Sequence, residues 1–205
     1  ARATASGMAA VTATFLSALK SGDHVVGAKA MFGACRYVIE DILARFGITS
    51  TLVDGDDLSQ WAAAITPNTK MLFLETPANP TLAIVDLKGV AAIAHKTGAL
   101  LVVDNAFASP ALQRPMELGA HIVVHSTTKF IDGQGRALGG MILCGQDFLE
   151  ENLQMVLRNT GPAISPFNAW LHLKSLETLD LRMKQHCENA LKVADFLAGQ
   201  KKVTR

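Results

Sequence analysis

One ten-residue stretch of the chain carries most of the information about its fold: His125–Gln134, with the sequence HSTTKFIDGQ. The apolar run Ile122–Val124 precedes it, and Lys129 stands in its middle, before a glycine-rich loop. A second apolar run, Leu100–Val103, ends on Asp104. Short, nearly continuous apolar runs are typical of strands buried on both faces of a sheet. We therefore expect the lysine and the aspartate to lie at the ends of two buried strands.

A reachable lysine and a buried aspartate at strand ends together predict a pyridoxal phosphate site. The lysine forms a Schiff base with the aldehyde of this cofactor, and the aspartate keeps its pyridine nitrogen protonated, so that the ring accepts electrons. An aspartate that follows four buried residues needs a cationic partner, which a pyridinium provides. A lysine after a strand is common, and a strand-end aspartate often begins a turn. The prediction therefore depends on the pairing of Lys129 with Asp104.

Strand and helix patterns alternate along the chain. Strands are predicted over residues 23–28, 49–53, 71–75, 100–104, 121–125 and 141–144, and helices over 7–21, 35–46, 58–65, 87–97 and 147–158. This order indicates an α/β fold with a mostly parallel buried sheet flanked by helices. Functional residues are then expected at the carboxyl ends of the strands. From residue 165 onward the spacing of leucines predicts one unbroken helix.

Composition excludes several classes of protein. The chain has 205 residues, 49% of them hydrophobic, and a net charge of +1, which fits one core of ordinary size with part of a second domain. A charge near zero gives no electrostatic case for binding nucleic acid or a membrane surface. The three cysteines, Cys35, Cys144 and Cys187, are far apart and predict reduced thiols of a cytoplasmic protein. No pair of histidines has metal-ligand spacing, so no metal site is predicted, and all six histidines are interpreted as structural or surface residues.

Four residues are candidates for binding the cofactor phosphate on their own chemistry. Ser6 and Gly7 open a predicted helix, whose first N–H groups form an anion site that a glycine lets a phosphate approach. Ser126 and Thr128 would add hydroxyl groups on one side of an extended segment. Each also has a simpler interpretation, since Ser6 is an ordinary N-cap and the others are ordinary loop residues.

Two further positions are ambiguous when each is taken alone. Asn79 lies between two prolines and either donates to the phenolic oxygen of the cofactor or forms an Asn-Pro turn. Phe32 follows a strand and either stacks on the pyridine ring or belongs to the core. The glycines after Lys129 do not form a dinucleotide-binding fingerprint, because their spacing is wrong.

Five motifs resemble those of a known family. They are TASGMAA at residues 4–10, ETPANPT at 75–81, VVDN at 102–105, STTKF at 126–130 and GPAISPFNAW at 161–170. In this order they resemble the Cys/Met-metabolism enzymes that depend on pyridoxal phosphate, the trans-sulfuration family of cystathionine synthases, cystathionine lyases and homoserine-ester sulfhydrylases. The resemblance implies the large domain of a fold type I transferase over residues 1–170, incomplete at its N-terminus. It implies a connecting helix and the start of a truncated C-terminal domain over residues 171–205, and a homotetramer built from active dimers.

The resemblance also implies a role for each matching residue. Lys129 is the expected Schiff-base lysine and proton shuttle, and Asp104 is the expected partner of the pyridine nitrogen. The other expected cofactor contacts are Gly7, Met8, Ser126 and Thr128 at the phosphate, Asn79 at the ring oxygen and Phe32 at the stacking position.

Three departures from the family pattern narrow the expected activity. Most members have tyrosine where this chain has Phe32, His and Asp where it has Gln134 and Arg136, and often threonine where it has Ala106. Phe32 together with DGQGR at 132–136 resembles the O-succinylhomoserine sulfhydrylase branch, which replaces succinate with sulfide to give homocysteine in methionine biosynthesis. The alternatives are a cystathionine γ-synthase or γ-lyase of the same family, or a non-catalytic fragment that binds the cofactor. The last remains open because the chain matches neither the family's N-terminal arm nor its substrate-binding C-terminal arginine.

Overall fold

A seven-stranded sheet forms the centre of the molecule in a computed structural model that describes residues 1–203. The strand order is β1-β7-β6-β5-β4-β2-β3. The five strands from β2 to β6 run parallel, while β7 is antiparallel to both of its neighbours. The bounds are β1 Arg2–Thr4, β2 His24–Ala28, β3 Thr49–Val53, β4 Thr69–Glu75, β5 Leu100–Asp104, β6 Ile122–Ser126 and β7 Gly140–Cys144. The predicted mostly parallel sheet is confirmed, with all six predicted strands in place.

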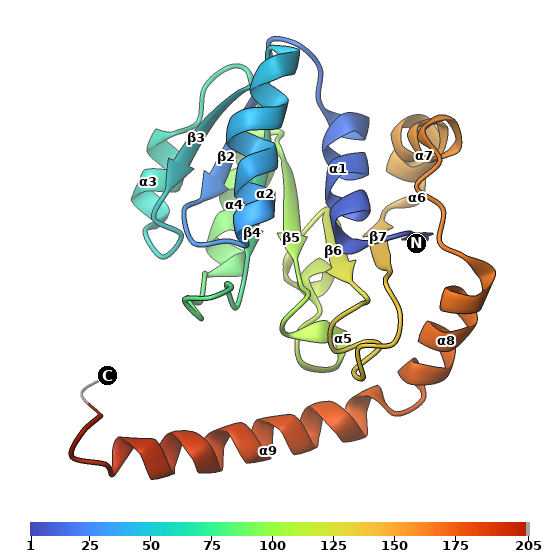
Figure 1. The fold of residues 1–205 in the computed structure, drawn as a ribbon. Helices are drawn as coiled ribbons and strands as arrows, with labels where there is room; N and C mark the ends of the chain where they lie inside the picture. Colours follow the sequence, from blue (N-terminus) through green and yellow to red (C-terminus); the bar gives the residue numbers. More distant parts are fainter. Residues whose placement is uncertain (204–205) are drawn as a thin grey trace.

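Helices cover both faces of the sheet (Figure 1). One face carries α1 (Gly7–Ala18), α2 (Gly33–Tyr37) and the segment from α6 (Gln146–Phe148) to α7 (Gln154–Thr160). The other face carries α3 (Leu58–Ala63) and α4 (Leu87–Thr97). The remaining elements are α5 Ser109–Leu112, α8 Pro166–Leu176, α9 Leu179–Ala198, the π-helical turns η1 Val38–Ile42 and η4 Leu149–Leu153, and the 3₁₀ turns η2 Leu43–Phe46 and η3 Pro115–Leu118.

Two apolar cores lie on opposite sides of the sheet. Along β4, Met71 and Phe73 point into the core under α1, whereas Leu72 and Leu74 point into the core under α4. This alternation follows from the two-residue period of a strand. Burial on both faces explains why the strands are almost continuously apolar in sequence.

Three predicted helices differ in detail from the structure. The segment at residues 35–46 passes from α2 into a π-helical and then a 3₁₀ turn, and the segment at 147–158 likewise contains a π-helical turn. Helical periodicity cannot tell these hydrogen-bonding patterns from a regular α-helix. The first helix ends at Ala18 rather than residue 21, because Leu19 is extended and the Lys20 N–H donates to the Asp23 carboxylate at 2.8 Å. The short strand β1 escaped prediction because three residues show no usable period.

The unbroken helix predicted from residue 165 onward is wrong. The chain forms α8 and α9, with a break at Glu177 and Thr178. The N–H groups of these two residues donate to the carbonyls of Lys174 and Ser175, each at 3.3 Å, which tightens the last turn of α8 and ends it. Leucines on both sides of the break keep a helical spacing, which is why the sequence pattern hides it.

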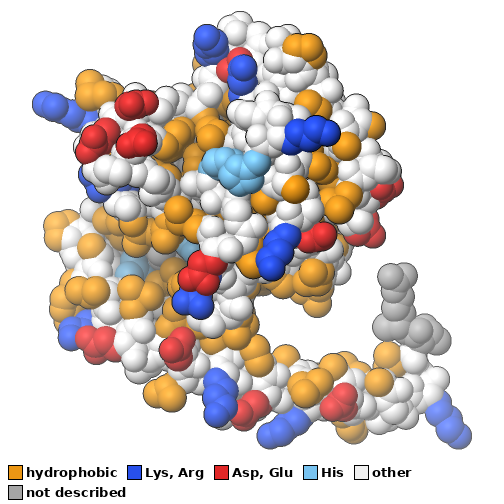
Figure 2. Space-filling view, turned by 180° about the vertical axis from the view of Figure 1, so that it is seen from behind, with side chains coloured by type: hydrophobic (Ala, Val, Ile, Leu, Met, Phe, Trp, Pro, Cys, Tyr) orange, Lys and Arg blue, Asp and Glu red, His pale blue; other side chains and the backbone are white. Residues whose placement is uncertain are grey.

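Helix α9 extends away from the sheet domain as an arm (Figures 1 and 2). Its first turn packs Leu179 and Met183 against Ile131, a third and smaller apolar cluster. Farther along, Val193, Phe196 and Leu197 form an exposed apolar stripe, and the Phe196 side chain is 65% exposed. Within residues 1–203, no helix combines the length and apolarity needed to cross a membrane. The division of the chain at residue 170 stays a prediction, and α8 runs across that point.

The apolar stripe of α9 should drive self-association of the 205-residue chain, because exposed apolar side chains gain free energy when they are covered. We expect Phe196→Glu to lower the average mass measured by light scattering at a fixed protein concentration. The matched control is Lys184→Glu, an exposed position on another side of the same helix. An equal effect of both substitutions would show that charge alone, and not the stripe, governs association.

Candidate active site

A pocket of about 280 Å³ opens at the carboxyl ends of β4, β5 and β6. All eight residues that the sequence predicts at the cofactor line this pocket: Gly7, Met8, Phe32, Asn79, Asp104, Ser126, Thr128 and Lys129. They come from α1, from the loops after β2 and β4, and from the ends of β5 and β6. The placement agrees with the rule that parallel strands present their functional residues at their carboxyl ends.

Two buried carboxylates form one wall of the pocket. Asp104 ends β5, Glu75 ends β4, and the two residues are direct register partners. The Asp104 side chain is 8% exposed and accepts a hydrogen bond from the Ala106 N–H at 3.0 Å. Within residues 1–203 neither carboxylate forms an ion pair with a lysine, arginine or histidine. A buried negative charge without a cation is costly, so this wall is suited to a cationic ligand group.

The electrostatics of the wall follow from this burial. Loss of solvent, and second the nearby charge of Glu75, raise the pKa of Asp104 to about 7, although the Ala106 N–H partly offsets them. Burial also raises the pKa of Glu75, against the N–H groups of Asn79 and Phe32. The Cys35 thiol lies 4.0 Å from Asp104 Oδ2, and burial with the two carboxylates raises its pKa. Cys35 is therefore a protonated, apolar neighbour of the site and not a nucleophile.

The opposite end of the pocket is suited to an anion. Helix α1 begins at Gly7 behind its N-cap Ser6, whose hydroxyl accepts a hydrogen bond from the Ala9 N–H at 3.0 Å. The N–H groups of Gly7 and Met8 point out of the helix end without an acceptor in the described residues. A Cβ at Gly7 would lie 2.7 Å from Ser126 Cβ, so only glycine lets the helix end approach β6. The Ser6 interpretation as an N-cap is thus correct, and it supports the anion site.

The lysine segment is a turn, so the prediction of an extended segment before Lys129 is wrong. The Lys129 N–H donates to the Ser126 carbonyl at 3.2 Å, and the Gly133 N–H donates to the Lys129 carbonyl at 2.7 Å. Ser126 and Thr128 still face the same pocket. The Thr128 hydroxyl is held by Gly139, donating to its carbonyl at 3.3 Å and accepting from its N–H at 3.1 Å. Lys129 is exposed to the pocket and its ammonium has no partner in the described residues.

Phe32 is a wall of the pocket and not a core residue, since its side chain is 41% exposed. Its backbone N–H donates to Glu75 Oε2 at 2.6 Å, which ties the loop after β2 to the end of β4. Glu75 therefore holds Phe32 in place and adds negative charge beside Asp104. The sequence places Glu75 among the strand-end residues, since it ends the buried run MLFLE just as Asp104 ends LLVVD, but no motif assigns it a contact.

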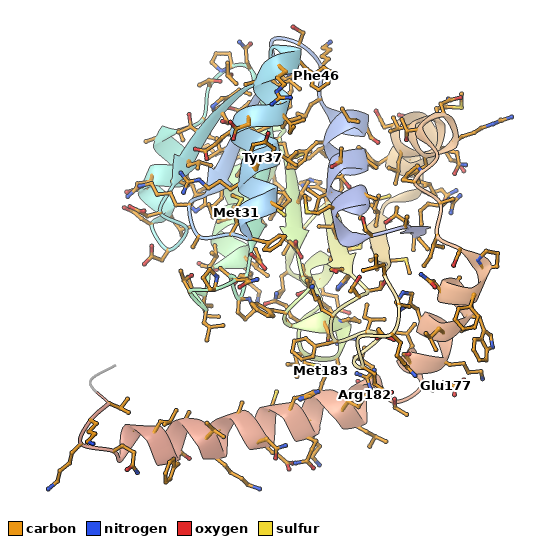
Figure 3. All side chains as sticks on the ribbon, viewed as in Figure 1. Met31, Tyr37, Phe46, Glu177, Arg182 and Met183 are labelled. Carbon is orange, nitrogen blue, oxygen red and sulfur yellow. The ribbon has the colours of Figure 1, made fainter. Side chains whose placement is uncertain are left out.

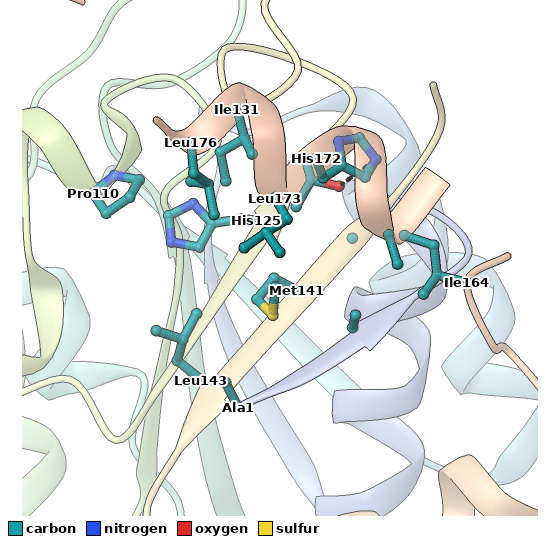
Figure 4. Close-up of a pocket in the computed structure, with 14 residues that line it drawn as sticks. Ala1, Pro110, His125, Ile131, Met141, Leu143, Ile164, His172, Leu173 and Leu176 are labelled. Carbon is teal, nitrogen blue, oxygen red and sulfur yellow. Dashed lines mark hydrogen bonds between the residues drawn. The ribbon is translucent and has the colours of Figure 1, made fainter. Parts of the chain in front are cut away.

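A second pocket, of about 320 Å³, lies behind the lysine turn (Figure 4). Its walls are mostly apolar, and they include Thr127 and Ile131 from the turn together with His125 and His172. Both histidines are buried, and loss of solvent lowers the pKa of His125 to about 4, so that it is neutral. Residues of the lysine turn thus face two pockets: Ser126, Thr128 and Lys129 line the first, whereas Thr127 and Ile131 line the second.

Pyridoxal phosphate fits the first pocket by the chemistry of its donors. The unpaired carboxylate of Asp104 matches the protonated ring nitrogen, and the free N–H groups of Gly7 and Met8 match the phosphate. The amine of Lys129, which lines the same pocket, matches the requirement of the cofactor's aldehyde for a primary amine. The aromatic side chains of Phe32 and Phe107 supply apolar walls for a flat ring.

Comparison with known proteins shows the family to which the chain belongs. The family model described as Cys/Met metabolism PLP-dependent enzyme matches residues 1–205. The chain is a member of this family of PLP-dependent trans-sulfuration enzymes, which confirms the resemblance inferred from its motifs.

The relatives that the chain matches differ from one another in activity. The chain is 48% identical to an O-succinylhomoserine sulfhydrylase of Mycobacterium tuberculosis over 98% of its own length and 50% of that protein. It is 41% identical to an L-methionine gamma-lyase of Fusobacterium nucleatum, over 99% of its own length and 52% of that protein. The crystal structure of metB from Corynebacterium glutamicum matches with a TM-score of 0.96 and 43% identity, covering 100% of this chain and 53% of that one. The chain thus spans about half the length of the curated relatives it matches.

The raised pKa of Asp104 predicts a pH-dependent stability of the cofactor-free protein. Because the folded state holds this proton more tightly than the unfolded chain, Asp104 favours folding at pH 4, and that advantage is lost as the pH rises to about 7. Asp104→Asn should therefore raise the Tm by several degrees at pH 8 but little at pH 4. Thermal unfolding from pH 4 to 8 measures the difference, with the exposed Asp147→Asn as control. A constant difference between Asp104→Asn and the parent protein at all pH values would contradict the raised pKa.

Proposed function

We propose that this chain contributes the cofactor-binding site of an O-succinylhomoserine sulfhydrylase, which replaces succinate with sulfide to form homocysteine. The observation that carries the proposal is the single pocket in which Lys129 faces the unpaired, buried carboxylate of Asp104. The similarity to sulfhydrylases over nearly the whole chain supports the choice of substrate. On this proposal the enzyme acts in methionine biosynthesis in the cytoplasm.

The proposed roles follow from where each side chain lies. When bound, pyridoxal phosphate supplies an electron sink for negative charge beside the substrate's amino group. Lys129 holds the cofactor and then moves protons at the substrate's α- and β-carbons, after which succinate leaves the γ-carbon and sulfide takes its place. General base action of this kind contributes roughly 10²–10⁴-fold to a rate. Asp104 balances the positive charge of the ring nitrogen.

The remaining residues bind and orient the cofactor. Gly7 and Met8 donate their N–H groups to the phosphate, with the hydroxyls of Ser126 and Thr128 beside them. The bond between Thr128 and Gly139 fixes that hydroxyl at the edge of the pocket. Asn79 contacts the ring oxygen, and Phe32 stacks on the ring face.

The second candidate function is elimination by a lyase of the same family, which the similarity to methionine γ-lyases favours. A cystathionine γ-synthase is a further alternative, at 41% identity. Phe32 favours replacement over elimination, because it has no phenolic hydroxyl for proton transfer. For the whole protein we propose a homotetramer, supported by the uncovered apolar stripe on α9.

The proposal is tested on the full-length protein with its cofactor. Borohydride reduction followed by peptide mapping should place the pyridoxyl group on Lys129. Product analysis with O-succinylhomoserine should give homocysteine when sulfide is present. Release of 2-oxobutanoate from cystathionine or methionine at a higher rate would favour the lyase. A label on Lys88, Lys96 or Lys174 in place of Lys129 would contradict the assigned site, and a bound cofactor without turnover would indicate a non-catalytic protein.

Phe32→Tyr should leave the Tm nearly unchanged, because the side chain is 41% exposed and its new hydroxyl reaches the open pocket. We expect the ratio of elimination to replacement products to rise, since a phenol can transfer protons there. The ratio is measured on O-succinylhomoserine with limiting sulfide. Phe46→Tyr, at an exposed phenylalanine outside the pocket, is the matched control. A large loss of Tm would show that the Phe32 ring is buried in the working enzyme.

A further inference from the structure

Arg182 connects helix α9 to the turn that carries Lys129. Its guanidinium donates to the carbonyls of Phe130 and Ile131, at 2.6 and 3.0 Å, which are the two residues directly after the lysine. It also donates to the carbonyl of Ser175 at 2.9 Å, at the end of α8. Figure 3 shows Arg182 and Met183 on the side of α9 that faces the sheet domain.

These contacts supply hydrogen-bond donors to two carbonyls that the lysine turn itself leaves without a partner. Residues 127–132 form a turn in which the Asp132 N–H donates to the Thr127 carbonyl at 2.8 Å, and the Gly133 N–H donates to the Lys129 carbonyl at 2.7 Å. The carbonyls of Phe130 and Ile131 accept no backbone hydrogen bond in the described residues, so they need another donor. Arg182 is the cation that the fold places there.

The neighbouring glycine makes room for this arginine. Gly133 has a φ of 73°, and a Cβ at this position would collide with the Arg182 guanidinium. A side chain at Gly133 would be strained by the backbone conformation and would displace the Arg182 guanidinium from its place. The glycine after the lysine turn, which fits no nucleotide-binding motif, has its explanation in this contact.

A second arginine reaches the same junction. Arg136 forms an ion pair with Asp132, which is fully buried, at 3.1 Å, and it donates to the Ser175 hydroxyl at 2.6 Å. Arg136 and its neighbours hold the pKa of Asp132 below its usual range, despite the cost of burial. The Ser175 hydroxyl therefore accepts from Arg136, and its carbonyl accepts from Arg182. Both arginines also contact residues of the segment that follows Lys129.

Arg182 does little for the stability of its own helix. It lies in the first turn of α9, where a positive charge opposes the helix dipole. Its N–H groups instead donate hydrogen bonds to two carbonyls of the turn and to the Ser175 carbonyl. They also donate to Thr178 Oγ1, at 3.1 Å.

We infer that Arg182 is a positioning residue for Lys129, which fixes the lysine turn and makes its geometry depend on the placement of α9. The inference deepens the proposed function, because it takes Lys129 as the lysine that holds the cofactor. Whatever packs against α9 then acts on the site through this arginine.

The test uses the full-length holoenzyme with Arg182→Gln and Arg182→Lys, and Arg158→Gln on α7 as the matched control. The Arg158 side chain is exposed and makes no hydrogen bond or ion pair in the described residues. Amide hydrogen exchange at Asp132 and Gly133 should quicken at least about tenfold in Arg182→Gln, since these amides close the turn. The kcat should fall by about ten- to one-hundred-fold with little change in KM, as for a misplaced catalytic group. For Arg182→Lys, the exchange rates and the kcat should lie between those of the parent enzyme and those of Arg182→Gln, because one ammonium cannot reach all three carbonyls.

Exchange rates and kcat within about twofold of the parent enzyme would overturn the inference. So would full recovery of both by Arg182→Lys, or an equal loss in Arg158→Gln. If Arg182→Gln does not fold, Arg182→Lys gives the same decision on its own. Borohydride labelling of the parent enzyme separates the two proposals: no label on Lys129 refutes the proposed function, whereas a labelled Lys129 with unchanged exchange refutes the role of Arg182 alone.

Discussion

The burial of Asp104 without a cation is the constraint on which the site depends. Its carboxylate ends a strand whose side chains are buried on both faces, and Glu75 ends the neighbouring strand beside it. Two buried carboxylates in register repel each other, which costs folding free energy. Among the described residues, such a pair occurs only at the carboxyl edge of the sheet. On the proposed function, a protonated pyridine ring would remove that cost, and its relief would then favour binding of the cofactor.

The rest of the pocket complements this negative wall with an electropositive end. The first N–H groups of α1 approach β6 only because Gly7 lacks a side chain, and the same helix end meets the turn that carries Lys129. A ligand with a cationic ring and an anionic phosphate therefore finds opposite charges at the two ends of one pocket. This polarity orients the cofactor before any covalent bond forms.

The sequence predicted the parts of this molecule that depend on local patterns. Strand positions followed from apolar runs, and the eight pocket residues followed from motif matches at strand ends and at one helix start. Contacts between distant segments were not predictable in this way. The break after α8 depends on hydrogen bonds that the leucine spacing does not reveal, and the role of Glu75 depends on a bond to the backbone of Phe32, 43 residues away. The turn at Lys129 was likewise not predictable, because its closing hydrogen bonds leave no periodic signal.

The position of the lysine turn between two pockets has a consequence for the whole enzyme. Ser126, Thr128 and Lys129 face the cofactor pocket, whereas Thr127 and Ile131 face the apolar pocket and the first turn of α9. Movement of α9 would shift Ile131 by direct packing and the adjoining carbonyls through Arg182. Because close-packed contacts transmit displacement rather than absorb it, we expect the position of Lys129 to depend on the position of α9. On this inference, whatever packs against α9 sets part of the geometry of the site.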